Sequence, residues 1–336
     1  MIYPRFVPKN GKISFIAPSL GCTTEPYFTR LKTAKRVLEE KGHTVEYGPN
    51  CFSNIKALSN TKELCAKEVN DYFSDKSTDA IISVGGGELM CEILPYIDFD
   101  VLRENPKWFM GFSDNTNLTF LLTTLCDVAS IYGPCAGQFG ITPWHQSIFD
   151  AYQILTGEKL SVKNYGKWEK SSLETDNPLE GLNLTEDTII ESKPKTFRIE
   201  GRLIGGCLDV LLLTLGTKFD KVKEFCEKYQ NDGIIWYFEA CDLNVMAIRR
   251  AFYQLDQAGW FKYVKGFIIG RPLNGENSIL DIDHIEAVYD VIEKYNVPCV
   301  FDVDLGHLPP SMPLINGSYA KVEVKDNDII IDMELK

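Results

Sequence analysis

Short apolar segments alternate with longer amphipathic ones through the first part of the chain, and this alternation restricts the fold more than any other feature. The apolar segments have the length of strands and lie at residues 12–19, 44–47, 80–84 and 129–134. Between them, residues 25–41 and 61–74 are expected helices, and the first has an apolar face made of Phe28, Leu31, Ala34, Val37 and Leu38. Strands that alternate with helices predict an α/β fold with a mostly parallel sheet flanked by helices.

The alternation returns in the second half of the chain and ends differently. A Gly-rich turn at residues 201–206 is expected to lead into an apolar helix that contains Leu211, Leu212 and Leu215. Strands are expected at 233–238, 264–271 and 298–303, and a helix at 244–258. The last segment, 320–332, has the pattern of a β-hairpin. The sequence therefore predicts a second, smaller α/β domain with a mixed sheet.

The alternation stops between residues 161 and 196. That segment is rich in Ser, Asp, Asn, Pro and Gly and is too long for a simple connection. Long loops in compact proteins are often functional. A chain of 336 residues is also long for one core. We therefore predict an N-terminal domain at residues 1–165, an irregular linker or substrate loop at 166–197 and a C-terminal domain at 198–336.

The net charge and the cysteines of the chain limit the classes of partner it can bind and the redox compartment in which it is expected. A formal charge of −12 argues against a general nucleic-acid-binding protein but leaves room for an anionic substrate held by a local Arg or Lys. Ten cysteines without a C-x-x-C pair indicate a reduced protein rather than a disulfide scaffold. We see no signal core and no segment long enough to cross a membrane, so a cytoplasmic protein is expected. The turn at 201–206 lacks the G-x-G-x-x-G pattern, and no cofactor is expected.

One serine stands where the first half of the chain changes from strand to helix. Residues 108–122 begin apolar, turn at Gly111, present Ser113 and continue into an apolar repeat with helical spacing. Helix-terminal amides favour negative charge at such a point, which suits a nucleophilic serine. A polar helix cap has the same sequence and is the alternative. The G-x-S-x-G pattern of a nucleophile elbow is half present, because Asn115 occupies the second glycine position.

Two further polar side chains follow buried strands. Glu239 comes directly after the strand at 233–238, and His307 follows the strand at 298–303 by a short loop. A serine needs a base such as histidine to take its proton, and a carboxylate holds that histidine in its working tautomer. Ser113, His307 and Glu239 supply these three roles. The structural alternatives are a strand-end carboxylate bonded to backbone amides and a rigid turn histidine.

The other three histidines have less suitable positions. His43 lies in a turn, His145 in a loop and His284 at the start of a helix, and each is expected to be a surface or capping residue. His307 has no partner histidine at the spacing of a metal site, which disfavours a metal hydrolase. We therefore expect no metal in the site.

These motifs together resemble the LD-carboxypeptidase family of serine peptidases, which includes the microcin C self-immunity peptidases. The resemblance covers nearly the whole chain, and the stretches that carry it are SVGG at 83–86, GFSDNT at 111–116, EGRLIGG at 200–206, FE at 238–239 and GH at 306–307. It implies a two-domain protein with Ser113 as nucleophile on the first domain. His307 as general base and Glu239 as its orienting partner would lie on the second. The family is commonly homodimeric, which implies a homodimer here.

With that resemblance, backbone amides are expected to stabilise the negative oxygen that forms during acyl transfer. The amide of Asp114 directly follows the nucleophile. A second amide is expected from the glycine run 85–87, at Gly86, because glycine permits a close approach of the backbone. A tight turn or a phosphate cradle would need the same glycines, although no Lys or Arg follows them.

The resemblance also implies hydrolysis of an amide bond near a free carboxylate. The substrate would be a muropeptide with a terminal D-alanine or, as in the microcin branch, a peptidyl-aminoacyl nucleotide. Trp168 in the middle segment either stacks on a nucleobase or packs its own loop. Arg271, at a strand end, either clamps a carboxylate or forms a structural ion pair. A rival of another class is a non-catalytic protein that binds a small ligand or peptide between the domains.

Overall fold

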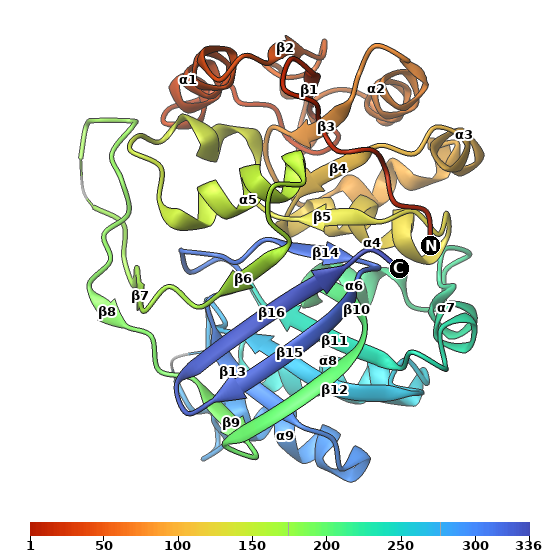
Figure 1. Ribbon diagram of the computed structural model, residues 1–336, viewed down its shortest axis with the longest axis vertical. Coiled ribbons are helices and arrows are strands. Elements are labelled where there is room, and N and C mark those ends of the chain that lie inside the picture. The colour runs from red at the N-terminus through yellow and green to blue at the C-terminus, as the bar shows by residue number, and fades with distance from the viewer. Residues whose placement is uncertain (174, 276) are drawn as a thin grey trace. The chain divides into compact units, whose positions relative to one another are not determined.

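A computed structural model describes residues 1–173, 175–275 and 277–336 of the protein (Figure 1). The chain forms two compact units. The first consists of Met1–Leu160 and Ser171–Asn183, and the second of Ser161–Lys170 and Leu184–Lys336. The middle of the chain therefore contributes to both units.

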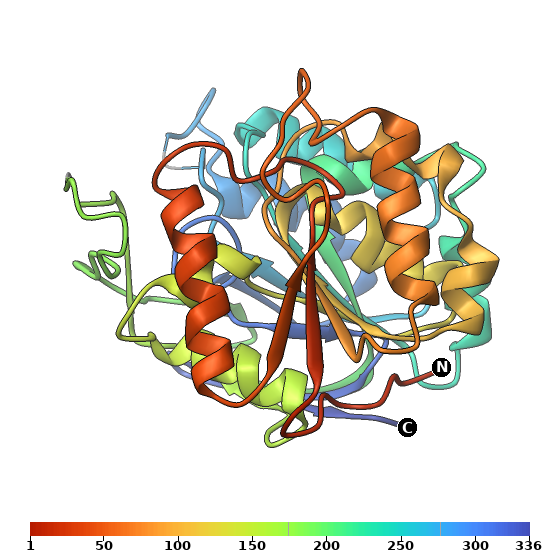
Figure 2. The same ribbon diagram turned by 90° about the horizontal axis from the view of Figure 1, so that it is seen from above.

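The first unit is built on a parallel sheet, as predicted. Its strands pair in the order β5-β4-β3-β1-β2. They are β1 Lys12–Ile16, β2 Thr44–Tyr47, β3 Ala80–Ser83, β4 Trp108–Gly111 and β5 Ser130–Tyr132. The helices are α1 Tyr27–Glu40, α2 Lys62–Ser74, α3 Phe99–Glu104, α4 Thr116–Thr124 and α5 Gln146–Thr156. Figure 2 shows α1 on one side of these strands and α2 on the other.

Most elements of the first unit were predicted because their sequence signals are local. The helix predicted at 61–74 is α2, which begins after Thr61, and the Thr61 side chain accepts a hydrogen bond from the amide of Leu64. Two helices were not predicted. Helix α3 has only 6 residues. Helix α5 is capped by the ring of His145, which is not one of the usual capping side chains.

The second unit is built on a mixed sheet, also as predicted. Its strands pair in the order β6-β16-β15-β10-β11-β12-β13-β9, and those from β10 to β13 are parallel. They are β6 Ser161–Lys163, β9 Glu191–Lys193, β10 Thr196–Cys207, β11 Ile234–Glu239, β12 Val264–Gly270, β13 Cys299–Val303, β15 Tyr319–Lys325 and β16 Asp328–Glu334. Strand β14 spans Leu314–Asn316, and β7 Lys167–Trp168 forms a separate ribbon with β8 Glu186–Asp187. The helices are α6 Leu208–Thr214, α7 Val222–Lys228, α8 Val245–Gln257 and α9 His284–Ile292.

The prediction of a Gly-rich turn at 201–206 was wrong, because these residues lie inside strand β10. A Cβ atom at Gly205 would lie 1.7 Å from the carbonyl oxygen of Tyr237 in β11. A Cβ atom at Gly201 would lie 2.9 Å from the carbonyl oxygen of Gly233. The glycines are therefore required by the close approach of two strands rather than by a change of direction.

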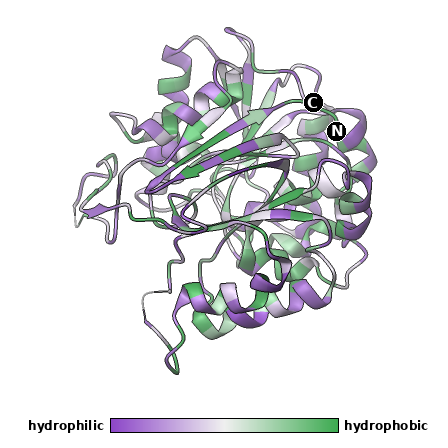
Figure 3. Ribbon diagram, turned by 60° about the horizontal axis from the view of Figure 1, so that its bottom comes forward, coloured by the Kyte–Doolittle hydropathy of each residue, from purple (hydrophilic) through white to green (hydrophobic). Residues whose placement is uncertain are grey.

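An aromatic core anchors strand β11 of the second unit. The Trp236 ring stacks on Phe238 and Trp260, with ring centroids 5.4 and 5.7 Å apart. Helix α8 covers this core with the buried side chains Val245, Ile248, Ala251, Phe252 and Leu255. Figure 3 shows hydrophilic and hydrophobic residues interspersed along the helices, as expected of helices with one buried face. None of the helices in the described ranges has both the length and the apolar character needed to span a membrane.

Candidate active site

Ser113 lies at a strained turn between strand β4 and helix α4. Strand β4 ends at Gly111, and Ser113–Asn115 form a short 3-10 helix that leads into α4. The φ angle of Ser113 is +62°, in the left-handed region that few residues except glycine adopt. Such a conformation costs on the order of 1–3 kcal/mol and is common at functional sites, including turns that present a nucleophilic serine.

The helix-cap alternative for Ser113 does not match this geometry. The N-cap residue of α4 is Asn115, and neither α4 nor the preceding 3-10 helix has a side-chain cap. The amide of Ser113 donates a hydrogen bond to the hydroxyl of Tyr132 at 3.3 Å, which ties the turn to strand β5. The serine is therefore presented by its backbone at the end of the strand.

Asn115 explains why only half of the elbow pattern is present in the sequence. Its Nδ2 donates hydrogen bonds to the carbonyl oxygens of Gly85 at 2.9 Å and Phe112 at 3.1 Å. A Cβ atom at Gly111 would lie 2.8 Å from the Cβ of Asn115, so the first glycine of the pattern makes room for the asparagine. The asparagine thus ties the serine turn to the glycine run after β3, a role that the sequence analysis missed.

The glycine run approaches Ser113 closely. A Cβ atom at Gly86 would lie 3.1 Å from both Cβ and Oγ of Ser113 and 3.9 Å from the amide nitrogen of Asp114. The two backbone segments predicted to form the oxyanion hole are therefore neighbours of the serine hydroxyl within the first unit.

Asp114 has a buried side chain that fixes the same turn. Its carboxylate accepts hydrogen bonds from Ser19 Oγ at 2.5 Å, the Met90 amide at 3.0 Å and Asn117 Nδ2 at 3.0 Å. Burial raises the pKa of Asp114, and these hydrogen bonds counteract part of that rise. The anchored side chain holds the Asp114 amide beside the serine.

Glu239 and His307 form a hydrogen-bonded pair in the second unit. Glu239 is the last residue of β11, and its Oε2 lies 2.7 Å from His307 Nδ1. The side chains are 0% and 14% exposed. Gly306 has φ of +113°, and a Cβ atom there would lie 2.7 Å from Glu239 Oε2. A glycine before the histidine is therefore needed for this turn to reach the carboxylate.

The environment of His307 favours its protonated form. Burial alone lowers the pKa of the imidazole, but the charge of Glu239 and hydrogen bonds with Cys241 and Glu239 raise it above the usual value for histidine. When Nδ1 donates its proton to the carboxylate, Nε2 is the basic nitrogen of the neutral ring. The pair can therefore stabilise an imidazolium that forms during proton transfer.

The other histidines differ from the sequence prediction in two cases. His145 caps α5, as predicted. His43 is 4% exposed and hydrogen bonds to the hydroxyl of Tyr152, so the expectation of a surface or capping residue was wrong there. His284 begins α9, but its Nε2 also lies 2.8 Å from Asp302 Oδ1. This second histidine–carboxylate pair joins residues on different elements, and no local sequence signal indicates it.

Trp168 and Arg271 lie together in the second unit, beside an open cavity of about 480 Å³. The guanidinium carbon of Arg271 is 4.4 Å from the centroid of the Trp168 ring, a cation–π contact. Arg271 Nη2 also forms an ion pair with Asp304 Oδ1 at 3.0 Å. The cavity is lined in part by Trp168, Lys170, Arg271, His284, Asp302 and Leu308. Arg271 thus has the structural ion pair of the second alternative and also borders a space for a ligand.

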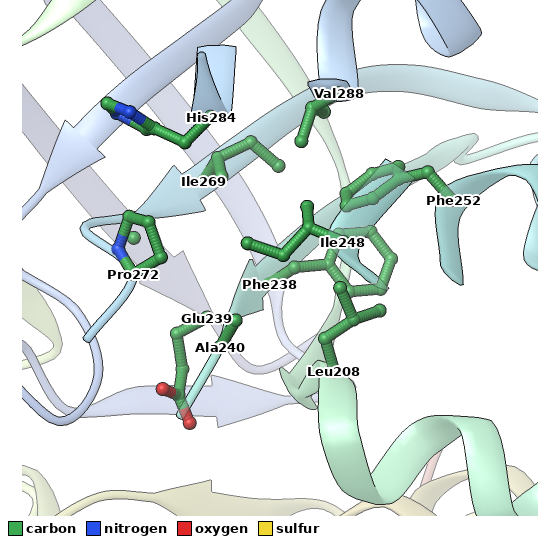
Figure 4. Close-up of a pocket in the computed structure, with 11 residues that line it drawn as sticks. Leu208, Phe238, Glu239, Ala240, Ile248, Phe252, Ile269, Pro272, His284 and Val288 are labelled. Carbon is green, nitrogen blue, oxygen red and sulfur yellow. The ribbon is translucent and has the colours of Figure 1, made fainter. Parts of the chain in front are cut away.

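A smaller apolar pocket lies between Glu239 and His284 (Figure 4). Its volume is about 10 Å³, room for one water molecule at most. Figure 4 shows the carboxylate of Glu239 pointing away from Leu208, Ile248 and Phe252. The pocket is therefore a packing gap under the carboxylate rather than a place for substrate.

The structure gathers the predicted residues into two groups. Ser113, Gly86 and Asp114 are neighbours in the first unit, and Glu239 and His307 pair in the second. Within the described residues, no group of three or more His, Cys, Asp and Glu side chains could hold a metal ion. The two groups contain the residue types that acyl transfer by a serine, a histidine and backbone amides uses.

The chain belongs to the LD-carboxypeptidase family and is a serine-type carboxypeptidase. Residues 13–133 match the N-terminal domain of that family, and residues 200–322 match its C-terminal domain. The first match contains the serine turn and the glycine run. The second contains Glu239 and His307.

Named relatives support the same family. The microcin C7 self-immunity protein MccF of Escherichia coli is 25% identical over 327 residues, which cover 96% of this chain and 92% of that protein. A probable murein peptide carboxypeptidase of Bacillus subtilis is 24% identical over 339 residues, which cover 98% and 94%. The solved structure of MccF in complex with aspartyl sulfamoyl adenosine has a TM-score of 0.82 at 22% identity and covers 100% of this chain and 99% of that one. At that identity, the last similarity shows a shared fold.

Proposed function

We propose that the protein hydrolyses an amide bond near a free carboxylate with Ser113 as nucleophile, His307 as general base and Glu239 as the partner that orients the histidine. The observation that carries the proposal is the 2.7 Å hydrogen bond between His307 Nδ1 and Glu239 Oε2 in a member of a serine peptidase family. We also propose that the two units correspond to the predicted domains, with the nucleophile on the first.

The proposed reaction has two halves. His307 Nε2 takes the proton of Ser113 Oγ as that oxygen attacks the substrate carbonyl, and the proton then passes to the leaving amine when the C–N bond breaks. A water molecule, deprotonated by the same histidine, then hydrolyses the acyl-serine ester. Glu239 stabilises the imidazolium in both halves. The amides of Gly86 and Asp114 donate hydrogen bonds to the oxyanion.

Two substrate classes fit the family, and the proposal includes both. One is a muropeptide whose terminal D-alanine follows an L-centre, as in peptidoglycan recycling. The other is a peptidyl-aminoacyl nucleotide of the microcin C type, for which Trp168 would stack on the base and Arg271 would hold an anionic group. The cavity beside Trp168 and the names of the relatives support the second class, and the murein carboxypeptidase relative supports the first. A cytoplasmic homodimer is part of the same proposal. The molar mass of the purified protein, measured by light scattering, tests whether it is a dimer.

The test is a trial of the purified protein against an L,D-tetrapeptide and a peptidyl-aminoacyl sulfamoyl adenosine. Release of D-alanine or of the aminoacyl sulfamoyl adenosine identifies the substrate class. A fluorophosphonate probe should at the same time form a covalent adduct at Ser113, located by mass spectrometry of the digested protein. Turnover without an adduct at Ser113, in a protein whose rate the probe does not reduce, would contradict the serine mechanism.

A further inference from the structure

Asp304 connects three separate parts of the second unit. It lies between β13 and His307 and is fully buried, with 0% of its surface exposed. Its Oδ2 accepts a hydrogen bond from the Tyr165 amide at 2.7 Å, and its Oδ1 accepts one from Thr188 Oγ1 at 2.9 Å. Arg271 Nη2 donates the third, at 3.0 Å. One buried carboxylate thus holds partners from both ends of the middle segment and from the end of β12.

The middle segment is attached at this carboxylate by the base of its β7–β8 ribbon. Tyr165 comes shortly before β7, and Thr188 comes directly after β8. The amide of Thr188 donates to the Gly166 carbonyl oxygen at 2.9 Å, which closes the ribbon at the same level. Hydrogen bonds to Asp304 therefore fix the base of the ribbon that carries Trp168.

A second attachment lies on the other side of His307. The amide of Glu169 donates to the carbonyl oxygen of Pro309 at 2.7 Å, and the amide of Met312 donates to the carbonyl oxygen of Asp304 at 2.7 Å. His307 thus lies between two residues that are bonded to the ribbon. Asp304 is three residues before it, and Pro309 is two residues after it.

Arg271 links the same carboxylate to the cavity. Its Nη2 donates to Asp304 and to the carbonyl oxygen of Asp302 at 2.9 Å, while its guanidinium stacks on Trp168. Its Nη1 is buried and has no hydrogen-bond partner among the described residues. Arg271 lines the cavity, as Trp168 does. An occupant beside Trp168 would thus act on both the ribbon and Arg271.

We propose that Asp304 is a positioning residue that makes the rate of the chemical step depend on occupancy of the Trp168 cavity. A substrate group bound there holds the ribbon and Arg271 in place. Through Asp304, these fix the turn that carries His307. Binding of a remote substrate group then raises kcat instead of only lowering KM. The effect can be large because a misplacement of about 1 Å costs on the order of a hundredfold in rate. This inference rests on the proposed role of His307 as base.

Thr188→Val is the sharpest test. It removes one donor to Asp304 and leaves no charge unpaired, because Arg271 still bonds the carboxylate. The substrates are a peptidyl-aminoacyl sulfamoyl adenosine and the same peptidyl-aminoacyl amide without the nucleoside. If only tetrapeptides are cleaved, an N-acetylmuramoyl L,D-tetrapeptide and the free tetrapeptide replace them. We expect kcat to fall about tenfold on the extended substrate and to stay within about twofold on the short one.

Two controls separate positioning from folding. Thr188→Ser keeps the hydroxyl and should restore kcat on the extended substrate. Thr78→Val removes a similar threonine–aspartate hydrogen bond in the first unit, from Thr78 Oγ1 to Asp75 Oδ2 at 3.0 Å. This variant should leave kcat unchanged on both substrates. Melting temperatures of all variants report any loss of stability.

The double variant Trp168→Ala with Thr188→Val completes the test. If Asp304 transmits occupancy of the cavity, kcat on the extended substrate should fall no further than in the Trp168→Ala variant alone. Equal losses of kcat on long and short substrates in Thr188→Val, no loss on either, or additive losses in the double variant would overturn the inference. The proposed function fails separately, if Ser113→Ala keeps its activity.

Discussion

The serine turn and the histidine turn are held by different kinds of contact. The Ser113 turn is bonded to uncharged partners: Asn115 donates to the Gly85 carbonyl oxygen, 30 residues away, and the buried Asp114 carboxylate accepts hydrogen bonds from Ser19, Met90 and Asn117. The His307 turn depends on buried carboxylates that pair with ionisable side chains, Glu239 with His307 and Asp304 with Arg271. Glu239 lies 68 residues away, and Asp304 is bonded to Tyr165 across 139 residues. The serine turn has a strained φ angle at Ser113, and the histidine turn depends on buried ionisable pairs.

This difference predicts different weaknesses. A change of Ser113 or Gly86 should affect the chemistry or the local backbone and remove no ionisable group. A change at the histidine turn should alter both the rate and its pH dependence, because a buried charge loses its partner. Four variants test this contrast.

The largest effect is expected for Ser113→Ala. Turnover should fall about a thousandfold or more because the nucleophile is removed, while the fold is retained. The measurements are kcat/KM on the substrate class identified above and far-UV circular dichroism. A rate near that of the wild type in protein free of contaminating peptidase would remove serine catalysis.

Glu239→Gln should slow turnover about a hundredfold or more and move the pH profile. The base must be neutral, so wild-type kcat/KM rises with pH through the raised pKa of His307. Without the carboxylate that pKa falls, and the rising limb should move to lower pH. An unchanged limb would show that Glu239 does not control the ionisation of His307.

The same variant should lose stability in a pH-dependent way. A histidine whose pKa is raised in the folded state stabilises the fold fully below its unfolded pKa of about 6.5 and loses that contribution as pH rises through the folded value. Urea titrations should therefore show a larger loss of stability in Glu239→Gln at pH 6 than at alkaline pH. At Ser113→Ala no such pH dependence is expected.

Gly86→Ala should reduce kcat about tenfold to a hundredfold, because the new Cβ would lie 3.1 Å from Ser113 Oγ and crowd the oxyanion site. Gly85→Ala is the matched control. Its Cβ would have its nearest neighbour, the Leu20 carbonyl oxygen, at an ordinary 3.5 Å. Equal losses of kcat in both variants would show that the run needs glycine for its own folding rather than for the serine.

The smallest effect concerns the strain itself. Ser113→Gly and Ser113→Ala both lack the nucleophile, but glycine adopts a φ of +62° at little cost. The glycine variant should therefore be more stable to urea by about 1 kcal/mol. At Ser14 in β1, the order should reverse, with alanine more stable than glycine. If alanine were also the more stable residue at position 113, the turn would not be strained in solution.

Features that depend on neighbouring residues in the sequence were predictable. The strand, glycine and serine of the first turn form one continuous signal, and the strand that ends at Glu239 is marked by its apolar run. The predicted helix at 244–258 is α8, which begins after the capping side chain of Asn244. These local patterns were enough for the fold class and for a list of candidate residues, whose catalytic roles stay predictions.

Features that depend on contacts between distant residues were not predictable. The glycines of β10 were predicted to form a turn, because the sequence does not show that β11 passes beside them. The pairing of His284 with Asp302 and the three partners of Asp304 likewise exist only after the elements have come together. Such contacts have no pattern along the chain.

The order of the strands in the second unit also affects how this protein is made. Strand β6 is its first strand in the sequence, yet β6 pairs with β16, where Val162 is the partner of Ile331. A ribosome that adds about 5–20 residues per second delivers β16 on the order of ten seconds after β6. The first unit is also incomplete until residue 183 has been added. During synthesis, the first unit thus lacks its last segment for about 20 residues after β6, and β6 lacks its partner strand until nearly the whole chain has been made.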